Sequence, residues 1–176
     1  MTNTARLWYS FDIQSVHISI LFSQERSHGI FVSQEQLSWL EQDLAQTNKK
    51  TIVCLHHSLA DQDLADNHWF SSRPTSGLIQ NRKAVRALLD NAKNVVAVLQ
   101  GHLHWNKKHV HNDIAYFSVQ SFSNNINPTS RICGSYAVIE QSSHGLTVDP
   151  WILPAEICPY IVATILSIIT SLRLGY

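Results

Sequence analysis

Two short stretches of the sequence carry closely spaced histidines directly after apolar runs that are typical of strands. These are His56-His57 after Thr51–Leu55 and Gly101-His102-Leu103-His104 after Val95–Leu99. Neutral imidazoles are common ligands of transition-metal ions. Binding groups in α/β sheets gather beyond the carboxyl ends of strands, so these histidines converge if the two strands are neighbours. The spacing therefore predicts a metal site.

The segment between the two histidine stretches predicts a parallel strand pair joined by a helix. Thr51–Leu55 is too short for a buried helix and suits a strand covered on both faces. A helix is expected from Asn81 to about Ala92, and a crossover helix favours parallel, adjacent strands. The long polar stretch Ser58–Ile79 has a length typical of a functional or disordered loop. Gly101 has no side chain, so we expect it to allow the backbone to turn toward the site after the second strand.

The flanking segments predict further strands and a second helix. Ser33 is a candidate N-cap for a helix over Gln34–Gln46, with Gln36 completing a capping box. Ser23–Phe31 is predicted to be a loop. Alternating or apolar runs predict strands at Leu7–Phe11, Val16–Phe22, Lys108–His111, Ile114–Val119, Tyr136–Ile139 and Leu146–Val148, with turns at Asn112-Asp113 and Ser143-His144-Gly145. This order predicts an α/β fold with mixed sheets flanked by helices.

Composition and charge narrow the class of protein. The chain has 13 basic and 13 acidic residues, so nothing indicates a nucleic-acid partner. Three widely separated cysteines argue against a disulfide framework and favour a reducing, cytoplasmic compartment. The uncharged stretch Ile157–Leu172 is shorter than the roughly 20 residues of a membrane span. We expect this stretch to be a buried helix or strand, or an irregular tail, rather than a membrane-associated tail.

Five stretches resemble, in order, the C-terminal half of the calcineurin-like metallophosphoesterases. They are YSFDIQSVHISIL, SQEQLSWLEQDLA, TIVCLHHSLAD, NVVAVLQGHLHWN and KKHVHNDIAYFSVQSF. Within that family the chain looks most like the cyclic-nucleotide phosphodiesterases and purple acid phosphatases. The resemblance runs from about Trp8 to Val148. It implies part of a phosphoesterase domain over 1–150, with the family's β-sandwich, and a hydrophobic tail over 151–176.

The resemblance also implies a site and an activity. It implies a pair of divalent or trivalent ions (Mn, Fe, Zn or Mg) and hydrolysis of small phosphate esters. By this resemblance His56 and His102 bind one ion, His104 binds the other, and His57 shapes the substrate pocket. Which of the two adjacent histidines, His56 or His57, is the ligand is left open by the sequence.

The family's earlier motifs have no counterpart in the expected places. Asp12, the aspartate near the start, has no histidine two residues on, and no Gly-Asp or Gly-Asn-His motif occurs. We therefore expect a truncated frame, a split gene product or a degenerate copy, which would need a complementary N-terminal fragment for activity. The alternatives are a non-catalytic, metal-binding remnant and a membrane-tethered interaction module.

Overall fold

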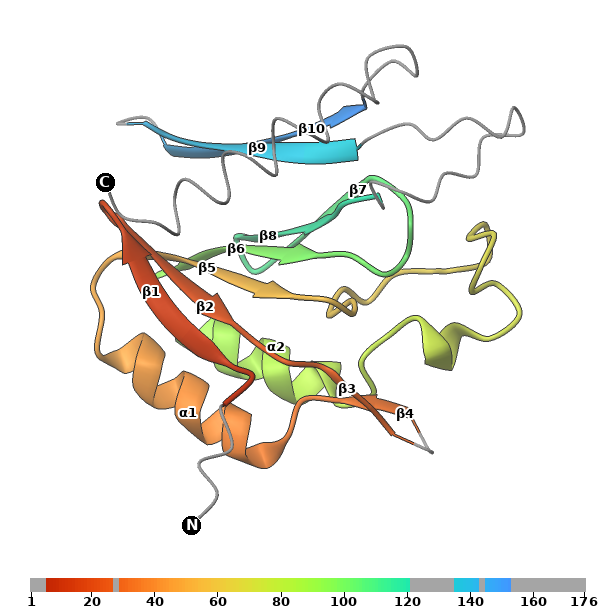
Figure 1. Cartoon of the computed structure of the whole chain (residues 1–176), viewed down its shortest axis with the longest axis horizontal. Coiled ribbons are helices and arrows are strands. Elements are labelled where there is room, and N and C mark those ends of the chain that lie inside the picture. The colour runs from red at the N-terminus through yellow and green to blue at the C-terminus, as the bar shows by residue number, and fades with distance from the viewer. Residues whose placement is uncertain (1–5, 27–28, 121–134, 143–144, 153–176) are drawn as a thin grey trace. The chain divides into compact units, whose positions relative to one another are not determined.

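The computed structural model describes residues 6–26, 29–120, 135–142 and 145–152. They fall in two compact units, one within 1–119 and one within 120–176. The first unit is built on a six-stranded mixed sheet with the order β1-β2-β5-β6-β8-β7 (Figure 1). Its strands are β1 (Tyr9–Ile13), β2 (Val16–Ile20), β5 (Lys50–Leu55), β6 (Val95–Gln100), β8 (Ile114–Ser118) and β7 (Lys107–His111). The four inner strands are parallel and the two edge strands are antiparallel to their neighbours.

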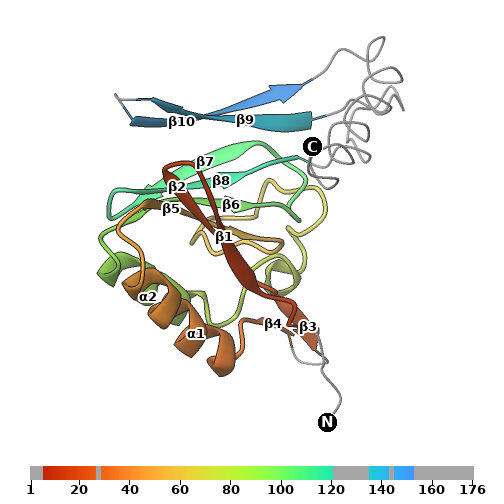
Figure 2. The same cartoon turned by 60° about the vertical axis from the view of Figure 1, so that its left-hand side comes forward.

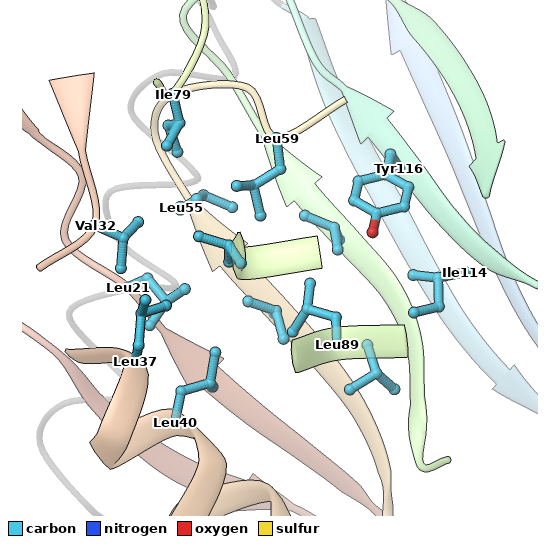
Figure 3. Packing of buried hydrophobic residues seen from close by; sticks show 14 of the residues in the cluster. Leu21, Val32, Leu37, Leu40, Leu55, Leu59, Ile79, Leu89, Ile114 and Tyr116 are labelled. Atoms are coloured by element: carbon cyan, nitrogen blue, oxygen red, sulfur yellow. The ribbon is translucent and has the colours of Figure 1, made fainter. Parts of the chain in front are cut away.

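Two helices, α1 (Gln34–Ala45) and α2 (Arg82–Asn91), cover the same face of this sheet (Figures 1 and 2). Leu40 of α1 and Leu89 of α2 are fully buried against Val53 of β5 and Val98 of β6. Figure 3 shows side chains from the helices, the strands and the following loops gathered in this core. Full burial of one such side chain contributes about 1.5–3 kcal/mol. The predicted α/β class, with a mixed sheet and flanking helices, is confirmed.

The start of α1 is tied to the end of β2. The Ser33 hydroxyl accepts the Gln36 amide at 3.3 Å, as predicted for an N-cap. The predicted capping box is wrong in its second half. The buried Gln36 side chain accepts from the Phe22 amide and donates to the Phe22 carbonyl, both at 2.8 Å, and it reaches the Ser33 hydroxyl at 3.4 Å rather than the Ser33 amide. A buried amide side chain forms hydrogen bonds to the chain segment that packs against it. Gln36 therefore fixes the path of the chain beyond β2.

Two predicted loops contain short regular elements. The expected loop Ser23–Phe31 contains a small antiparallel hairpin of β3 (Gln24–Arg26) and β4 (Gly29–Phe31). The long loop after β5 contains the short helix η1 (Pro74–Ser76). In addition, His17 of β2 is buried between Asp12 and Asp43, with ring nitrogens 2.7 and 3.0 Å from their carboxylate oxygens.

The second unit contains an antiparallel pair, β9 (Ser135–Ser142) and β10 (Gly145–Ile152). Both strands are longer than predicted, and residues 143–144 of the predicted turn lie outside the described residues. The stretch Ile157–Leu172 also lies outside them. Among the described helices, none is long and apolar enough to cross a membrane.

Candidate metal centre

The two predicted histidine stretches lie at the same edge of the sheet. Strands β5 and β6 are parallel neighbours, and the register pairs Leu55 with Gln100. One residue further on, the Gly101 amide donates to the His56 carbonyl at 2.9 Å. The pairing therefore continues past the strands and delivers both stretches to one place, as their spacing predicts.

Three of the four imidazoles form a close cluster. One ring nitrogen from each of His56, His57 and His102 lies within 4.8 Å of the others. The shortest separation is 3.2 Å, between Nε2 of His56 and Nδ1 of His102. The rings of His57 and His102 are 4.2 Å apart between centroids. His57 is buried, His102 is half-buried and His56 is exposed, so solvent reaches the cluster from the side of His56.

The orientation of His102 is fixed by the backbone of the long loop. Its Nε2 lies 2.9 Å from the carbonyl oxygen of Ser76 in η1. A carbonyl only accepts hydrogen bonds, so Nε2 carries the proton of the neutral ring. Nδ1 then presents a lone pair toward His56. A metal-binding histidine commonly donates its other N–H to a carbonyl in this way.

His57 differs from His56 in how its ring is held. Its Nδ1 lies 2.6 Å from the Ser23 hydroxyl, which also accepts the His57 amide at 3.3 Å. Through these two contacts Ser23, which lies between β2 and β3, fixes the position of the His57 ring and occupies its Nδ1. His56, in contrast, directs Nε2 at His102. All three histidines belong to the group whose ring nitrogens lie within 4.8 Å of one another, so the choice between His56 and His57 as ligand stays a prediction.

The turn that carries His102 and His104 is in an unusual backbone conformation. Both histidines have positive φ angles, 64° and 51°. The Leu103 amide donates to the Gly101 carbonyl at 2.7 Å, which closes a γ-turn centred on His102. A γ-turn with a positive central φ is rare and strained, and such strain gathers at functional sites.

The role expected for Gly101 is therefore wrong. Its φ is not positive, and a Cβ atom there would meet His56 only at 3.6 and 3.7 Å, which is ordinary contact. The histidines themselves bear the strained conformation.

His104 lies beside the cluster rather than in it. Its Nδ1 is buried and has no hydrogen-bond partner among the described residues. Burial lowers the pKa of His104 below its ordinary value, and the charge of His56 lowers it further. An unsatisfied buried nitrogen costs about 1–3 kcal/mol unless a ligand or water pairs with it.

The long loop is anchored on the histidine turn by Asn67, which sequence reasoning missed. The buried Asn67 donates from Nδ2 to the Leu103 carbonyl at 2.8 Å, and its Oδ1 accepts the amides of Trp69 and Phe70 at 3.0 Å each. The Asp-Asn pair in a polar stretch indicates a turn, but not which distant carbonyl the side chain reaches. A small cluster of Leu64, Leu78, Leu103, Phe70 and Trp105 packs beneath this corner.

Gln100, at the end of β6, was also missed. Its Oε1 accepts the Leu59 amide at 2.9 Å, and its Nε2 donates to the hydroxyls of Ser58 and Ser118 at 2.8 and 3.1 Å. The buried side chain therefore joins the ends of β5, β6 and β8 just below the histidines.

Comparison with known proteins finds partial similarity to metal-dependent phosphoesterases. No protein-family model matches the chain. It is 32% identical over 106 residues to purple acid phosphatase 22 of Arabidopsis thaliana, and 29% identical over 102 residues to a probable cyclic nucleotide phosphodiesterase of Fibrobacter succinogenes. Each match covers 58% of this chain. The chain is related to the calcineurin-like metallophosphoesterases.

The relation to the metallophosphoesterases is partial in length. The matches span 22% of the plant phosphatase and 36% of the bacterial phosphodiesterase. A dimetal phosphatase from Danio rerio has a similar fold, with a TM-score of 0.55 at 12% identity, covering 84% of this chain and 60% of that one. At this identity the structural likeness bears on the fold alone.

The donor set fits a transition-metal ion. Two nitrogen ligands of one zinc ion, each about 2.0–2.1 Å from it, lie about 2.8–3.4 Å apart, the lower value in octahedral and the upper in tetrahedral geometry. The 3.2 Å between His56 and His102 falls in this range. The cluster of three contains imidazoles and no carboxylate among the described residues, a composition that suits zinc, copper, iron or nickel better than magnesium.

Proposed function

We propose that the chain carries part of a metallophosphoesterase site that binds a transition-metal ion and acts on small phosphate esters. His56 and His102 would hold the ion, His104 would supply a further nitrogen, and His57 would line the substrate pocket. The 3.2 Å approach of His56 to His102, with the far side of His102 held by Ser76, carries this proposal.

The chain's own residues prepare the site in three ways. Ser76 keeps the proton of His102 on Nε2, so that Nδ1 faces the site. Ser23 holds the buried His57 ring beside it. Gln100 fixes the strand ends that carry both histidine stretches. When bound, an ion would supply charge neutralisation on a phosphoryl oxygen and an acidified water.

The number of ions follows from the ligand types. Three imidazoles, here those of His56, His102 and His104, and a water are a known ligand set for one catalytic zinc ion. A pair of hard ions would need bridging carboxylates, and the group of His56, His57 and His102 contains none. We therefore propose one ion for this chain alone, and a pair only with a complementary fragment that adds carboxylates. The competing function is metal binding without hydrolysis.

Metal binding is tested by calorimetric titration of the whole chain with zinc and with manganese. We expect one zinc site in the wild type and at least a tenfold loss of affinity in His56→Ala and His102→Ala. His109→Ala is the matched control, because this half-buried histidine lies on β7, outside the cluster. Equal zinc affinity in wild type, His56→Ala and His102→Ala would overturn the site.

Hydrolysis is tested on 4-nitrophenyl phosphate and bis(4-nitrophenyl) phosphate with the metal that binds. The chain is assayed alone and after co-expression with the polypeptide encoded upstream of it. A rate that disappears in His102→Ala supports the phosphoesterase. Zinc binding without a rate above metal-only controls in either preparation supports the non-catalytic alternative.

A further inference from the structure

We propose that the edge strand β1 is a homodimerisation surface, on which β1 of a second copy of the chain pairs in antiparallel orientation. The two six-stranded sheets then join into one continuous sheet. This inference does not depend on the proposed function, because the histidines lie beyond the ends of β5 and β6, and β2 separates these strands from β1.

The backbone of β1 carries hydrogen-bonding groups that point away from the sheet. β1 is an edge strand with β2 as its neighbour (Figures 1 and 2). Ile13 and Val16 flank a two-residue turn and face each other in the register. Residues in this position exchange backbone hydrogen bonds. Antiparallel pairs alternate between bonded and non-bonded, so the N–H and C=O groups of Ser10 and Asp12 point away from β2, toward another strand.

The side chains of β1 form an exposed apolar stripe on one face of the sheet. Tyr9, Phe11 and Ile13 are 55%, 42% and 55% exposed. The Ser10 hydroxyl donates to Asp43 of α1 at 2.5 Å, so the residues that alternate with Ser10 face away from the helices. The rings of Tyr9 and Phe11 stack with centroids 6.1 Å apart. Contiguous exposed apolar side chains of this kind mark an interaction surface.

The two edges of the sheet differ in their protection against pairing. The opposite edge strand, β7, carries the exposed lysines Lys107 and Lys108, and lysines on edge strands disfavour pairing with another chain. β1 contains neither lysine nor proline. Its one charged residue, Asp12, is bound by Lys49 and by His17, each at 2.7 Å. Pairing through β1 therefore ends at two copies, because the protected β7 edge does not continue it into a filament.

The strand is complementary to itself in one antiparallel register. A two-fold axis at Phe11 places this ring opposite its equivalent, and Tyr9 opposite Ile13 of the second copy. Ser10 then faces Asp12 of the second copy, and these are the residues whose backbone groups point outward. Phe11 becomes a non-bonded pair, in which side chains approach most closely.

The neighbouring registers are less favourable. An axis at Asp12 would place two carboxylates opposite each other, which is destabilising. An axis at Ser10 would leave Ile13 without an apolar partner. The match of apolar with apolar side chains, and of Asp12 with Ser10, favours a second copy over an unrelated peptide.

The dimer is tested by sedimentation velocity of the whole chain between about 10 µM and 1 mM. Two strands of five residues make a small interface, and small interfaces give reversible complexes. We therefore expect a monomer at the lowest concentration and a dimer at the highest. Amide hydrogen exchange at Ser10 and Asp12 should slow as the concentration rises, whereas exchange at Phe11, whose amide points toward β2, should not change.

Variants at the proposed two-fold axis test the register. Phe11→Lys and Phe11→Glu should each remain monomeric, because like charges then face each other. An equimolar mixture of the two should dimerise again, because opposite charges face each other. Val110→Lys is the matched control, since Val110 is an exposed apolar residue on the other edge strand, and it should dimerise as the wild type does. Amide exchange in the wild type decides the question even if a variant does not fold.

The outcomes separate the second copy from other partners of this edge. A monomer at every concentration overturns the proposal, as does a dimer that persists in Phe11→Lys or is also lost in Val110→Lys. A mixture of Phe11→Lys and Phe11→Glu that stays monomeric overturns the register. Amides of Ser10 and Asp12 that slow only when the polypeptide encoded upstream is added assign the edge to that fragment and overturn the homodimer.

Discussion

Asn67 is the side chain whose loss should most affect the histidine turn. Asn67→Ala removes three hydrogen bonds of 2.8–3.0 Å from a residue that is 2% exposed. Leaving the Leu103 carbonyl without its partner costs about 1–3 kcal/mol. The amides of Trp69 and Phe70 lie nearer solvent, and each should add about 0.5–1 kcal/mol. The free energy of unfolding should therefore fall by about 2–5 kcal/mol.

Urea unfolding of the whole chain, followed by circular dichroism, measures this loss. Asn67→Asp keeps the acceptor oxygen but not the amide donor, so an intermediate loss is expected. Asn91→Ala is the control, because Asn91 is exposed near the end of α2 and its replacement should change stability by less than about 0.5 kcal/mol. Zinc affinity should also fall in Asn67→Ala, because Leu103 lies between His102 and His104. A stability loss no larger than that of Asn91→Ala would refute the reasoning.

Three further changes have expected outcomes. Tyr116→Phe removes a buried hydroxyl that has no hydrogen-bond partner among the described residues, so melting should show equal or slightly higher stability. Gly77→Ala places a Cβ 2.8 Å from a Leu64 methyl and should cost about 1–3 kcal/mol in urea unfolding. Burial lowers the pKa of His17, but hydrogen bonds to Asp12 and Asp43 outweigh this and raise it above 6.5. Protonated His17 therefore stabilises the fold fully below pH 6.5 and progressively less as the pH rises through its folded pKa. In unfolding curves at pH 5.5 and 8.5, His17→Gln should lose more stability at the lower pH, and an equal loss at both would contradict this.

Local patterns in the sequence were enough to predict most elements that position the site. The β-branched run Thr51–Leu55 and the run Val95–Leu99 became β5 and β6, and the intervening helix became α2 within one residue at each end. Hydrophobic periodicity carries this information because it reflects which face of a strand or helix is buried. The hairpin Ser23–Phe31 escaped prediction because its strands of three residues are too short to show a period.

What the sequence determined by itself was that histidines follow two parallel strands joined by a crossover helix, so that they must meet at one sheet edge. Tertiary structure decided which ring atoms face each other. The Ser76 carbonyl orients His102, the Ser23 hydroxyl holds His57, and Asn67 binds Leu103. Each of these bonds joins residues more than 20 positions apart. Their geometry depends on how the long loop packs against the sheet edge, and no local periodicity records that path.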